Sequence, residues 1–215
     1  MSIGSFTRKV FGQVVLEKVN SAFNGEIYVT KDFLGEKRIL IGGLTQSGRI
    51  IEKIWDKVLK QLEKKPSKVL ILGFGGGGAA RVINKRFPKA KITALEIDPE
   101  IVKLAKKYFE VKRIKNLKLI VDDASSWIKT AKEKFDLVLV DIYCGEEIPR
   151  SCQKETFFKN IKRLLVPSGT AIFNHLYGGE DIKRAEKFKA KLEKVFFQVT
   201  GSRAVANILF KAKKE

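Results

Sequence analysis

Alternating apolar and polar positions at the start of the chain predict a small antiparallel sheet. Candidate strands cover residues 12–19, 26–30 and 37–41, and Asn24-Gly25 is a tight-turn signal between the first two. Short strands joined by such turns pair with their neighbours in sequence. We therefore expect residues 1–48 to form a small β-domain.

From residue 49 onward, apolar residues recur at helical spacing and then alternate with short apolar runs. The spacing predicts a first helix over 49–62, which Pro66 ends. The following stretches predict strands at 69–72, 91–96, 117–121, 135–140 and 170–175, and helices at 79–86, 99–109, 125–134, 154–165 and 181–194. Continuous apolar strands between amphipathic helices are typical of a parallel sheet covered on both faces.

Two final strands, at 196–200 and 204–210, flank Gly201-Ser202 and predict an antiparallel hairpin at the edge of this sheet. The predicted fold class is therefore α/β. It consists of a doubly wound, mostly parallel, Rossmann-like sheet over residues 49–215, with the antiparallel C-terminal hairpin and the small N-terminal β-domain.

The chain is strongly basic, with 43 Lys and Arg against 24 Asp and Glu and a net charge of +19. Such a charge can attract nucleic acid. The lysines are spread along the whole chain, which is the usual pattern of solvated faces. We therefore favour a protein without a nucleic-acid partner, and weak binding to polyanions stays open as the less favoured interpretation.

Location and metal content are also predicted from composition. No window approaches 18 uninterrupted apolar residues, so we expect no membrane span. The first 15 residues lack a charged segment followed by a long apolar run, which indicates no secretory signal. Cys144 and Cys152 are the two cysteines and His175 is the single histidine, which suits a reducing compartment and leaves little for a metal cage. We expect a cytoplasmic protein without a metal.

The segment GFGGGG places five glycines in the six positions 73–78, directly after the predicted strand 69–72. Glycines allow a sharp turn and a close approach of a ligand to the backbone, and the next helix begins with free N–H groups. A tight strand-to-helix turn without any ligand is the alternative. The acids that follow the later strands decide between the two.

Polar side chains recur at the ends of three successive strands: Glu96 and Asp98, then Asp122 and Asp123, then Asp141 with Tyr143. The carboxyl ends of parallel strands meet at one edge of a sheet, where ligands bind. Glu96 lies 23 residues after Gly73, the spacing at which a carboxylate accepts hydrogen bonds from a ribose diol. We therefore predict a nucleoside site with the ribose at Glu96 and the adenine amino group at Asp123.

The acid-rich edge also indicates which nucleoside binds. A dinucleotide is one possibility, with its pyrophosphate at the helix N-terminus. A sulfonium nucleoside such as S-adenosylmethionine is cationic near its sulfur and is compatible with surrounding carboxylates. The acids and the antiparallel final hairpin favour the sulfonium nucleoside.

The segments VLILGFGGGGAARVI, ITALEIDPEIVKLAKKYF and FDLVLVDIY, within residues 26–175, resemble spermidine synthase and its relatives. These are polyamine aminopropyltransferases built on the class I methyltransferase-type Rossmann fold. The resemblance implies decarboxylated S-adenosylmethionine as donor, a polyamine as acceptor, methylthioadenosine as product and a homodimer. It also implies that Gln46, Gly73, Glu96 and Asp123 hold the nucleoside. Together with their neighbours on the same strand ends, the predicted nucleoside-binding residues are Gln46, Gly73, Gly75, Gly77, Glu96, Asp98, Asp122, Asp123 and Ala124.

The chain departs from the family pattern at two positions. Gly76 stands where the family's glycine loop usually carries an acid for the aminopropyl amine of the donor. Cys144 stands where the family usually has the acid that helps to take the proton of the acceptor amine. Glu52 and Asp141 match the family's amine-binding residues, and Asp56 is a candidate substitute for another.

Group transfer from a sulfonium is an in-line displacement, in which the acceptor must arrive as a neutral nucleophile. We predict that Asp141 orients or deprotonates this nucleophile, and that Tyr143 forms a wall or donates a hydrogen bond. Three functions stay open: an aminopropyltransferase; a methyltransferase that uses S-adenosylmethionine, with Arg81 near its carboxylate; and a nucleoside-binding or basic scaffold protein without turnover.

Overall fold

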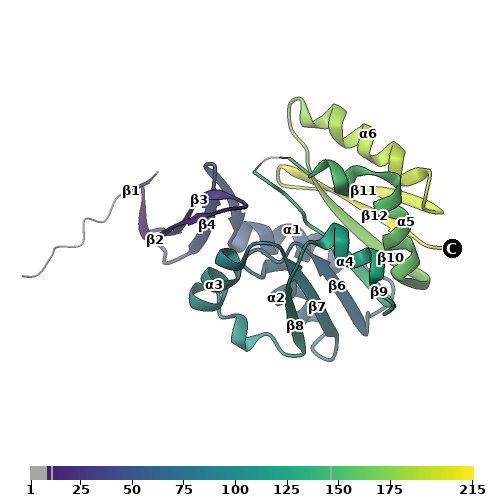
Figure 1. The fold of residues 1–215 in the computed structure, drawn as a ribbon, viewed down its shortest axis with the longest axis horizontal. Coiled ribbons are helices and arrows are strands. Elements are labelled where there is room, and N and C mark those ends of the chain that lie inside the picture. Colours follow the sequence, from purple (N-terminus) through teal and green to yellow (C-terminus); the bar gives the residue numbers. More distant parts are fainter. Residues whose placement is uncertain (1–8, 11, 146) are drawn as a thin grey trace, which may run out of the picture.

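The computed structural model describes residues 9, 10, 12–145 and 147–215 as two sheets with six α-helices (Figure 1). The prediction about a secretory signal rests largely on residues 1–8, which lie outside this range. Within the described part of the chain, no helix combines the length and the apolarity needed to cross a membrane.

The N-terminal sheet is antiparallel, as predicted. Its strands follow the order of the sequence: β1 (Lys9–Val10), β2 (Gln13–Ser21), β3 (Gly25–Lys31), β4 (Lys37–Ile41) and β5 (Leu44–Ser47). Ile27, Val29 and Ile39 point from this sheet onto Ile101 and Leu104 of the third helix, so a small core joins the two sheets. The division into domains 1–48 and 49–215 stays a prediction.

The second sheet has seven strands in the order β11-β12-β10-β9-β6-β7-β8. Their bounds are β6 (Lys68–Leu72), β7 (Lys91–Glu96), β8 (Leu117–Val121), β9 (Phe135–Val140), β10 (Leu165–Leu176), β11 (Gln198–Ala204) and β12 (Asn207–Lys213). Strands β6 to β10 pair in parallel, and β12 is antiparallel to both β10 and β11. The C-terminal hairpin lies at the edge of the sheet, as predicted, with β12 next to β10 and β11 outermost. Its turn is at Val205-Ala206, however, and Gly201-Ser202 lies within β11 instead of separating the two strands, because β11 pairs with β12 as far as Ala204 and Asn207.

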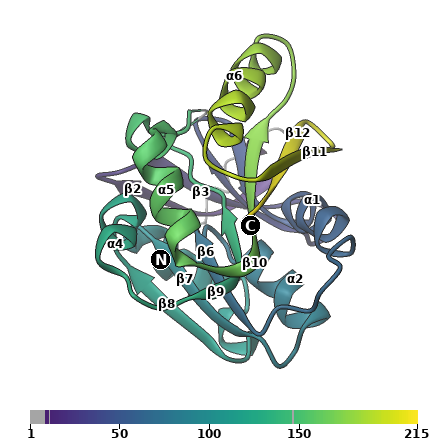
Figure 2. The same cartoon turned by 90° about the vertical axis from the view of Figure 1, so that its right-hand side faces the viewer.

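Helices cover both faces of the second sheet (Figures 1 and 2). The helices are α1 (Arg49–Leu59), α2 (Gly78–Arg86), α3 (Pro99–Tyr108), α4 (Ala124–Thr130), α5 (Glu155–Leu164) and α6 (Asp181–Glu193). Successive residues of β6 alternate between the faces: Val69 and Ile71 pack with α1 to α3, whereas Leu70 and Leu72 pack with α4 to α6. The doubly wound α/β fold class is therefore confirmed.

Among the other bounds that differ from the prediction, two have a clear physical reason. The helix expected over 125–134 ends at Thr130, and Arg163 donates from its guanidinium to the carbonyls of Ile128 (2.6 Å) and Ala131 (2.8 Å) at that end. Strand β10 begins at Leu165 rather than at Thr170, because the chain keeps its pairing with β9 across an irregularity between these two residues.

Candidate active site

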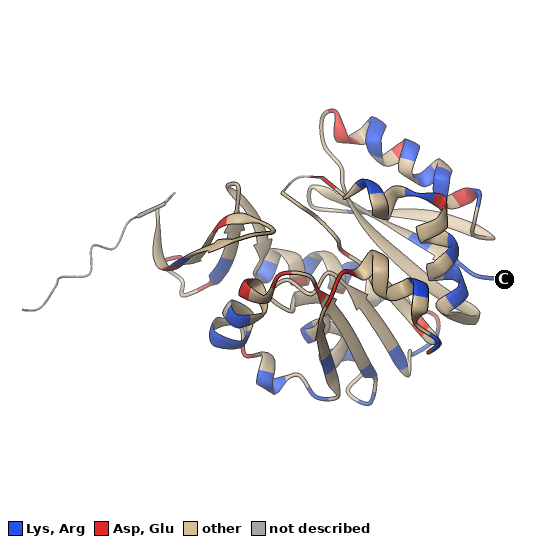
Figure 3. Cartoon of the chain, in the orientation of Figure 1, with Lys and Arg blue, Asp and Glu red and all other residues tan. Residues whose placement is uncertain are grey.

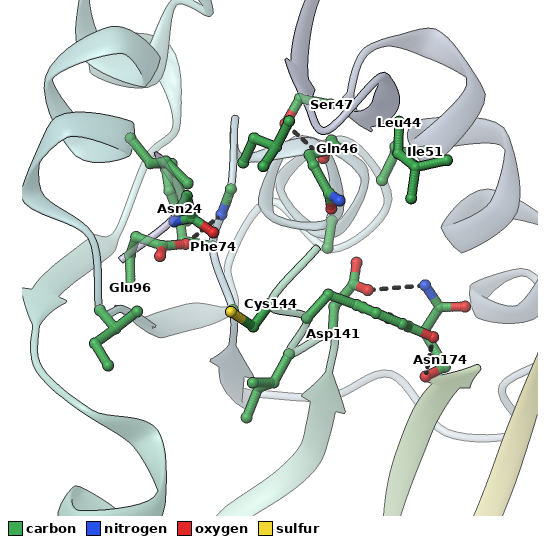
Figure 4. Close-up of a pocket in the computed structure, with 18 of the residues that line it drawn as sticks. Asn24, Leu44, Gln46, Ser47, Ile51, Phe74, Glu96, Asp141, Cys144 and Asn174 are labelled. Atoms are coloured by element: carbon green, nitrogen blue, oxygen red, sulfur yellow. Dashed lines mark hydrogen bonds between the residues drawn. The ribbon is translucent and has the colours of Figure 1, made fainter. Parts of the chain in front are cut away.

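A cavity of about 600 Å³ opens at the carboxyl ends of the parallel strands, where the order of the strands reverses between β6 and β9. Both sheets contribute to its wall. The β2–β3 turn and β5 come from the N-terminal sheet, and the glycine loop, α1 and the ends of β7 to β10 complete the wall (Figure 4). The predicted site residues that line it are Gln46, Gly73, Gly75, Glu96, Asp122, Asp123, Ala124, Asp141 and Tyr143.

The glycine loop is shaped first by packing within the protein. A Cβ at Gly73 would lie 2.1 Å from the backbone oxygen of Asp141, and a Cβ at Gly77 would lie 2.8 Å from the ring of Phe74. Both glycines also have positive φ angles, +89° and +80°. The turn itself thus requires these two glycines. The evidence for a ligand comes from the acids at the neighbouring strand ends.

Glu96 ends β7 and turns its carboxylate toward the glycine loop. Its Oε2 accepts from the backbone N–H of Gly75 at 2.8 Å, and its Oε1 accepts from the N–H of Asp98 at 3.2 Å. Burial raises the pKa of this carboxyl, and the backbone hydrogen bonds from Gly75 and Asp98 oppose that rise. Glu96 therefore stands at the predicted place, fixed beside the loop and facing the cavity.

The end of β8 supplies Asp122, Asp123 and Ala124 to the cavity wall. Asp123 is also the N-cap of α4, because it accepts from the backbone N–H of Ser125 at 3.0 Å and from the hydroxyls of Ser125 and Ser126. Burial raises its pKa, but these hydrogen bonds outweigh burial and hold the pKa below its usual range. Asp123 is thus an ionised acceptor at the edge of the cavity.

Gly77 and Asp98 are not among the residues that line the cavity. Asp98 is fully buried and caps α3 by accepting from the N–H of Glu100 at 2.9 Å. Its other oxygen accepts from Ser21 Oγ and from Asn24 Nδ2 (2.7 Å). The structure therefore gives Asp98 an anchoring contact with the β2–β3 turn instead of a ligand contact.

The β2–β3 turn is a part of the wall that sequence reasoning missed. Phe23 and Asn24 line the cavity, although they lie more than 70 residues before Glu96 and Asp98. Asn24-Gly25 was recognised only as a turn, since nothing local indicates what that turn covers. The turn also reaches Cys144, whose thiol lies 3.8 Å from the carbonyl oxygen of Phe23.

Asp141 directly follows β9 and is held by two donors from other elements. Its Oδ1 accepts from Asn174 Nδ2 on β10 at 2.8 Å, and its Oδ2 accepts from Trp55 Nε1 on α1 at 3.1 Å (Figure 4 shows the Asn174 bond). Burial raises the pKa of Asp141, and both donors oppose the rise. Trp55 is fully buried, and it fixes the candidate base as well as packing in the core.

Tyr143 lies beside Asp141 and is immobilised by the end of β10. Its hydroxyl accepts from the N–H of Leu176 at 2.9 Å and donates to the carbonyl of Asn174 at 3.3 Å. Burial raises the pKa of the phenol, and the neighbouring Asp141 raises it further, so Tyr143 stays protonated at neutral pH. Because its one hydroxyl hydrogen is donated to Asn174, Tyr143 is suited to forming a wall rather than to donating to a ligand. The catalytic roles of Asp141 and Tyr143 stay predictions.

The other candidate amine-binding acids are engaged outside the cavity. Glu52 forms an ion pair with Arg81 at 2.6 Å, and Asp56 forms one with Arg86 at 2.7 Å. Arg81 also donates to the carbonyls of Gly76 and Phe109, so its guanidinium holds the glycine loop in place. None of these four side chains lines the cavity.

The space beyond Gly76 is filled by Ser47. A Cβ at Gly76 would lie 2.5 Å from Ser47 Oγ, which accepts the N–H of Gly76 at 2.6 Å and donates to the carbonyl of Gln46. Gln46 itself lines the cavity and reaches the carbonyl of Gly145 at 3.3 Å. Within the described residues, no group of three or more His, Cys, Asp or Glu side chains could hold a metal ion.

Comparison with known proteins places this site in a family. The model of the spermine/spermidine synthase domain matches residues 52–208. A polyamine aminopropyltransferase of Prochlorococcus marinus is 30% identical over 74% of this chain and 59% of the relative. An eEF1A lysine and N-terminal methyltransferase homolog of Drosophila pseudoobscura pseudoobscura is 31% identical over 60% of this chain and 20% of the relative. The chain thus spans little more than half of the first relative and a fifth of the second.

A solved structure supports the fold. A spermidine synthase in complex with the transition-state analogue AdoDATO matches with a TM-score of 0.80 and 19% identity, over 94% of this chain and 74% of that chain. The relatives are aminopropyltransferases and methyltransferases by name, which supports the prediction of a transferase.

Proposed function

Because the chain belongs to the family of the spermine/spermidine synthase domain, we propose that it transfers an aminopropyl group from decarboxylated S-adenosylmethionine to an amine. One observation carries the proposal: the buried carboxylate of Glu96 faces the cavity from the end of β7 and is fixed beside the glycine loop. A ribose diol donates to such a carboxylate in nucleoside sites of this topology.

The order of the strands supports a direction for the donor. The adenine amino group would donate to Asp123 at the end of β8, and the ribose would lie at Glu96 on β7. Gln46, Gly73, Gly75, Asp122 and Ala124 complete the proposed nucleoside site. The sulfonium would then lie over β6 and β9, within reach of Asp141.

The transfer step needs a neutral amine and a place for its proton. The nitrogen lone pair attacks the methylene carbon that is bonded to sulfur. The carbon–sulfur bond breaks with its electron pair on sulfur, which leaves methylthioadenosine as a neutral thioether. The new ammonium then passes its proton to Asp141, whose raised pKa suits it as a base, while Trp55 and Asn174 hold the carboxylate in place.

Methyl transfer from S-adenosylmethionine is a second candidate, and the geometry at Gly76 favours it. Residue 76 offers no acid to an aminopropyl amine, and Ser47 fills the space into which a side chain there would project. The relative that is a methyltransferase by name also supports methyl transfer on this fold. The product would be S-adenosylhomocysteine.

Donor use separates these candidates in one experiment. The protein is titrated calorimetrically with each donor, then incubated with each donor and a panel of diamines and monoamines, and the products are identified by mass spectrometry. Methylthioadenosine with an aminopropylated amine supports the first proposal, and S-adenosylhomocysteine supports the second. Donor binding without either product indicates a nucleoside-binding protein. Failure to bind any adenosyl sulfur compound overturns the nucleoside site itself.

Two further proposals come from the resemblance. We propose a homodimer, which light scattering of the purified protein would test, and a cytoplasmic location, which fractionation of cells would test. A monomer at micromolar concentration would contradict the first, and recovery with membranes would contradict the second.

A further inference from the structure

The cavity has two halves of different chemistry. The nucleoside half lies over the ends of β7 and β8, where Glu96, Asp122 and Asp123 line it. The other half lies beyond Asp141, over β10 and β12, because these strands follow β9 in the sheet. The acceptor must occupy this second half if the donor occupies the first.

Apolar side chains dominate the second half. They come from the inner face of α1, the end of β10 and the turn between β11 and β12: Ile50, Ile51, Ile54, Leu176, Val205 and Ala206. Among the described residues that line the cavity, Asp141 is the single carboxylate on this side. The polar groups near it, Asn174 and Tyr143, are already bonded to the protein.

Two acids that could have supplied a second negative charge form ion pairs outside the cavity. Glu52 and Asp56 both lie on α1, next to the apolar lining, but they pair with Arg81 and Arg86 instead of facing the cavity. The net charge of +19 provides no further attraction for a cation. The described residues of this half of the cavity are therefore suited to bind a molecule that has one amine and an apolar body.

We propose that the acceptor is a primary monoamine with an apolar chain or ring, rather than a diamine. This rests on the proposed function and names its acceptor class. The amine would meet Asp141, and the apolar body would gain by leaving water for the isoleucine-lined wall. A diamine would have to desolvate its second ammonium among apolar side chains, and the described residues that line this half offer no second carboxylate to pair with it.

A matched pair of acceptors tests whether the acceptor is a monoamine. 1-Aminopentane and 1,4-diaminobutane have the same number of heavy atoms and differ in one terminal group. We expect the monoamine to have a kcat/KM at least about tenfold higher with whichever donor is used, as for one uncompensated buried charge. 2-Phenylethylamine should also be accepted. Equal rates, or a preference for the diamine, would overturn the proposal.

A binding measurement gives the same comparison without turnover. Protein saturated with methylthioadenosine is titrated calorimetrically with the two amines, and the monoamine should bind at least about tenfold more tightly. Tighter binding of the diamine would contradict the acceptor class. If methylthioadenosine and both donors fail to bind, the proposed function fails instead, so the two failures are distinguishable.

Introducing a second carboxylate should reverse the preference. Ile51→Asp adds an acid to the second half, and Ile51→Asn is its uncharged control. Val205→Asp with Val205→Asn is a second pair, at an exposed turn position with a φ of 58° that Asp and Asn tolerate. In at least one pair, the Asp variant should improve the diamine-to-monoamine ratio about tenfold over its Asn control. Unchanged ratios in both folded pairs would contradict the proposal.

Discussion

Glu96 is the residue on which nucleoside binding depends most. Its carboxylate is already bonded to the backbone of Gly75 and Asp98, so its position does not depend on the ligand. Replacing it with an amide of the same shape, Glu96→Gln, removes the charge that would accept from both ribose hydroxyls. We expect donor affinity to fall roughly 10- to 100-fold, as for hydrogen bonds to charged groups. Calorimetric titration of both proteins with the donor measures this change in affinity.

Glu100→Gln is the matched control for that variant. Glu100 lies in the first turn of α3, pairs with Lys103 and does not line the cavity. Its loss should leave donor affinity unchanged. If both variants weaken binding equally, or if Glu96→Gln binds the donor as the wild type does, Glu96 does not hold the ribose.

Asn174 should tune the candidate base through its hydrogen bond to Asp141. The base acts when ionised, so kcat/KM should fall as the pH drops through the raised pKa of Asp141. Asn174 donates to the carboxylate and opposes the effect of burial, so Asn174→Ala should raise the pKa further. We expect the acidic limb of the pH–rate profile to move to higher pH. A lower rate with an unmoved limb would assign Asn174 a purely structural role.

The sequence predicts single site residues better than their partners. Glu96, Asp123 and Asp141 were predicted because each lies at the end of a strand, and all three line the cavity because the ends of parallel strands meet at one edge. Trp55 and Asn174 were missed as partners of Asp141, since their contacts span 86 and 33 residues. Asp98 was assigned to the ligand because it shares a strand end with Glu96, although its side chain turns to the β2–β3 turn.

At the scale of elements, the glycine loop is constrained by β5. Gly76→Ala would place a Cβ 2.5 Å from Ser47 Oγ and 2.7 Å from Ser47 Cβ. We expect it to lower the free energy of unfolding by about 2 kcal/mol through overpacking. Adding Ser47→Gly should restore part of this loss by freeing the space. Chemical denaturation of the single and double variants measures both effects.

Gly78→Ala provides the comparison for the same loop. A Cβ there would lie 3.4 Å from the nearest atom, on Ile51, which is an ordinary contact, and its φ is not positive. The free energy of unfolding of Gly78→Ala should stay close to that of the wild type. A similar loss for Gly76→Ala and Gly78→Ala, or no rescue by Ser47→Gly, would show that crowding by Ser47 is not the cause.

The elements themselves followed from local patterns, but their bounds did not always do so. Periodicity identified each helix from α1 to α6, because their apolar stripes face a sheet. The C-terminal hairpin and its place at the sheet edge were also predicted. The position of its turn was not, since Gly201-Ser202 suggests a break between strands but lies within β11.

At the scale of the whole molecule, positive charge is distributed over all six helices, whereas several acids gather at the strand ends (Figure 3). Spread charge should give weak, salt-dependent binding to polyanions without a defined site. We expect raising the salt from about 50 to about 200 mM to weaken binding to a short DNA duplex about tenfold or more. The donor should not compete, because acids surround the cavity.

Two pairs of charge reversals test whether this charge is truly delocalised. Lys106→Glu with Lys112→Glu changes the region of α3, and Lys187→Glu with Lys191→Glu changes the exposed face of α6. Because each pair removes the same charge from a different face, spread attraction predicts similar and modest losses of DNA affinity in fluorescence anisotropy. A large loss from one pair alone would instead indicate a nucleic-acid site on that face, and the less favoured interpretation of the net charge would then be correct.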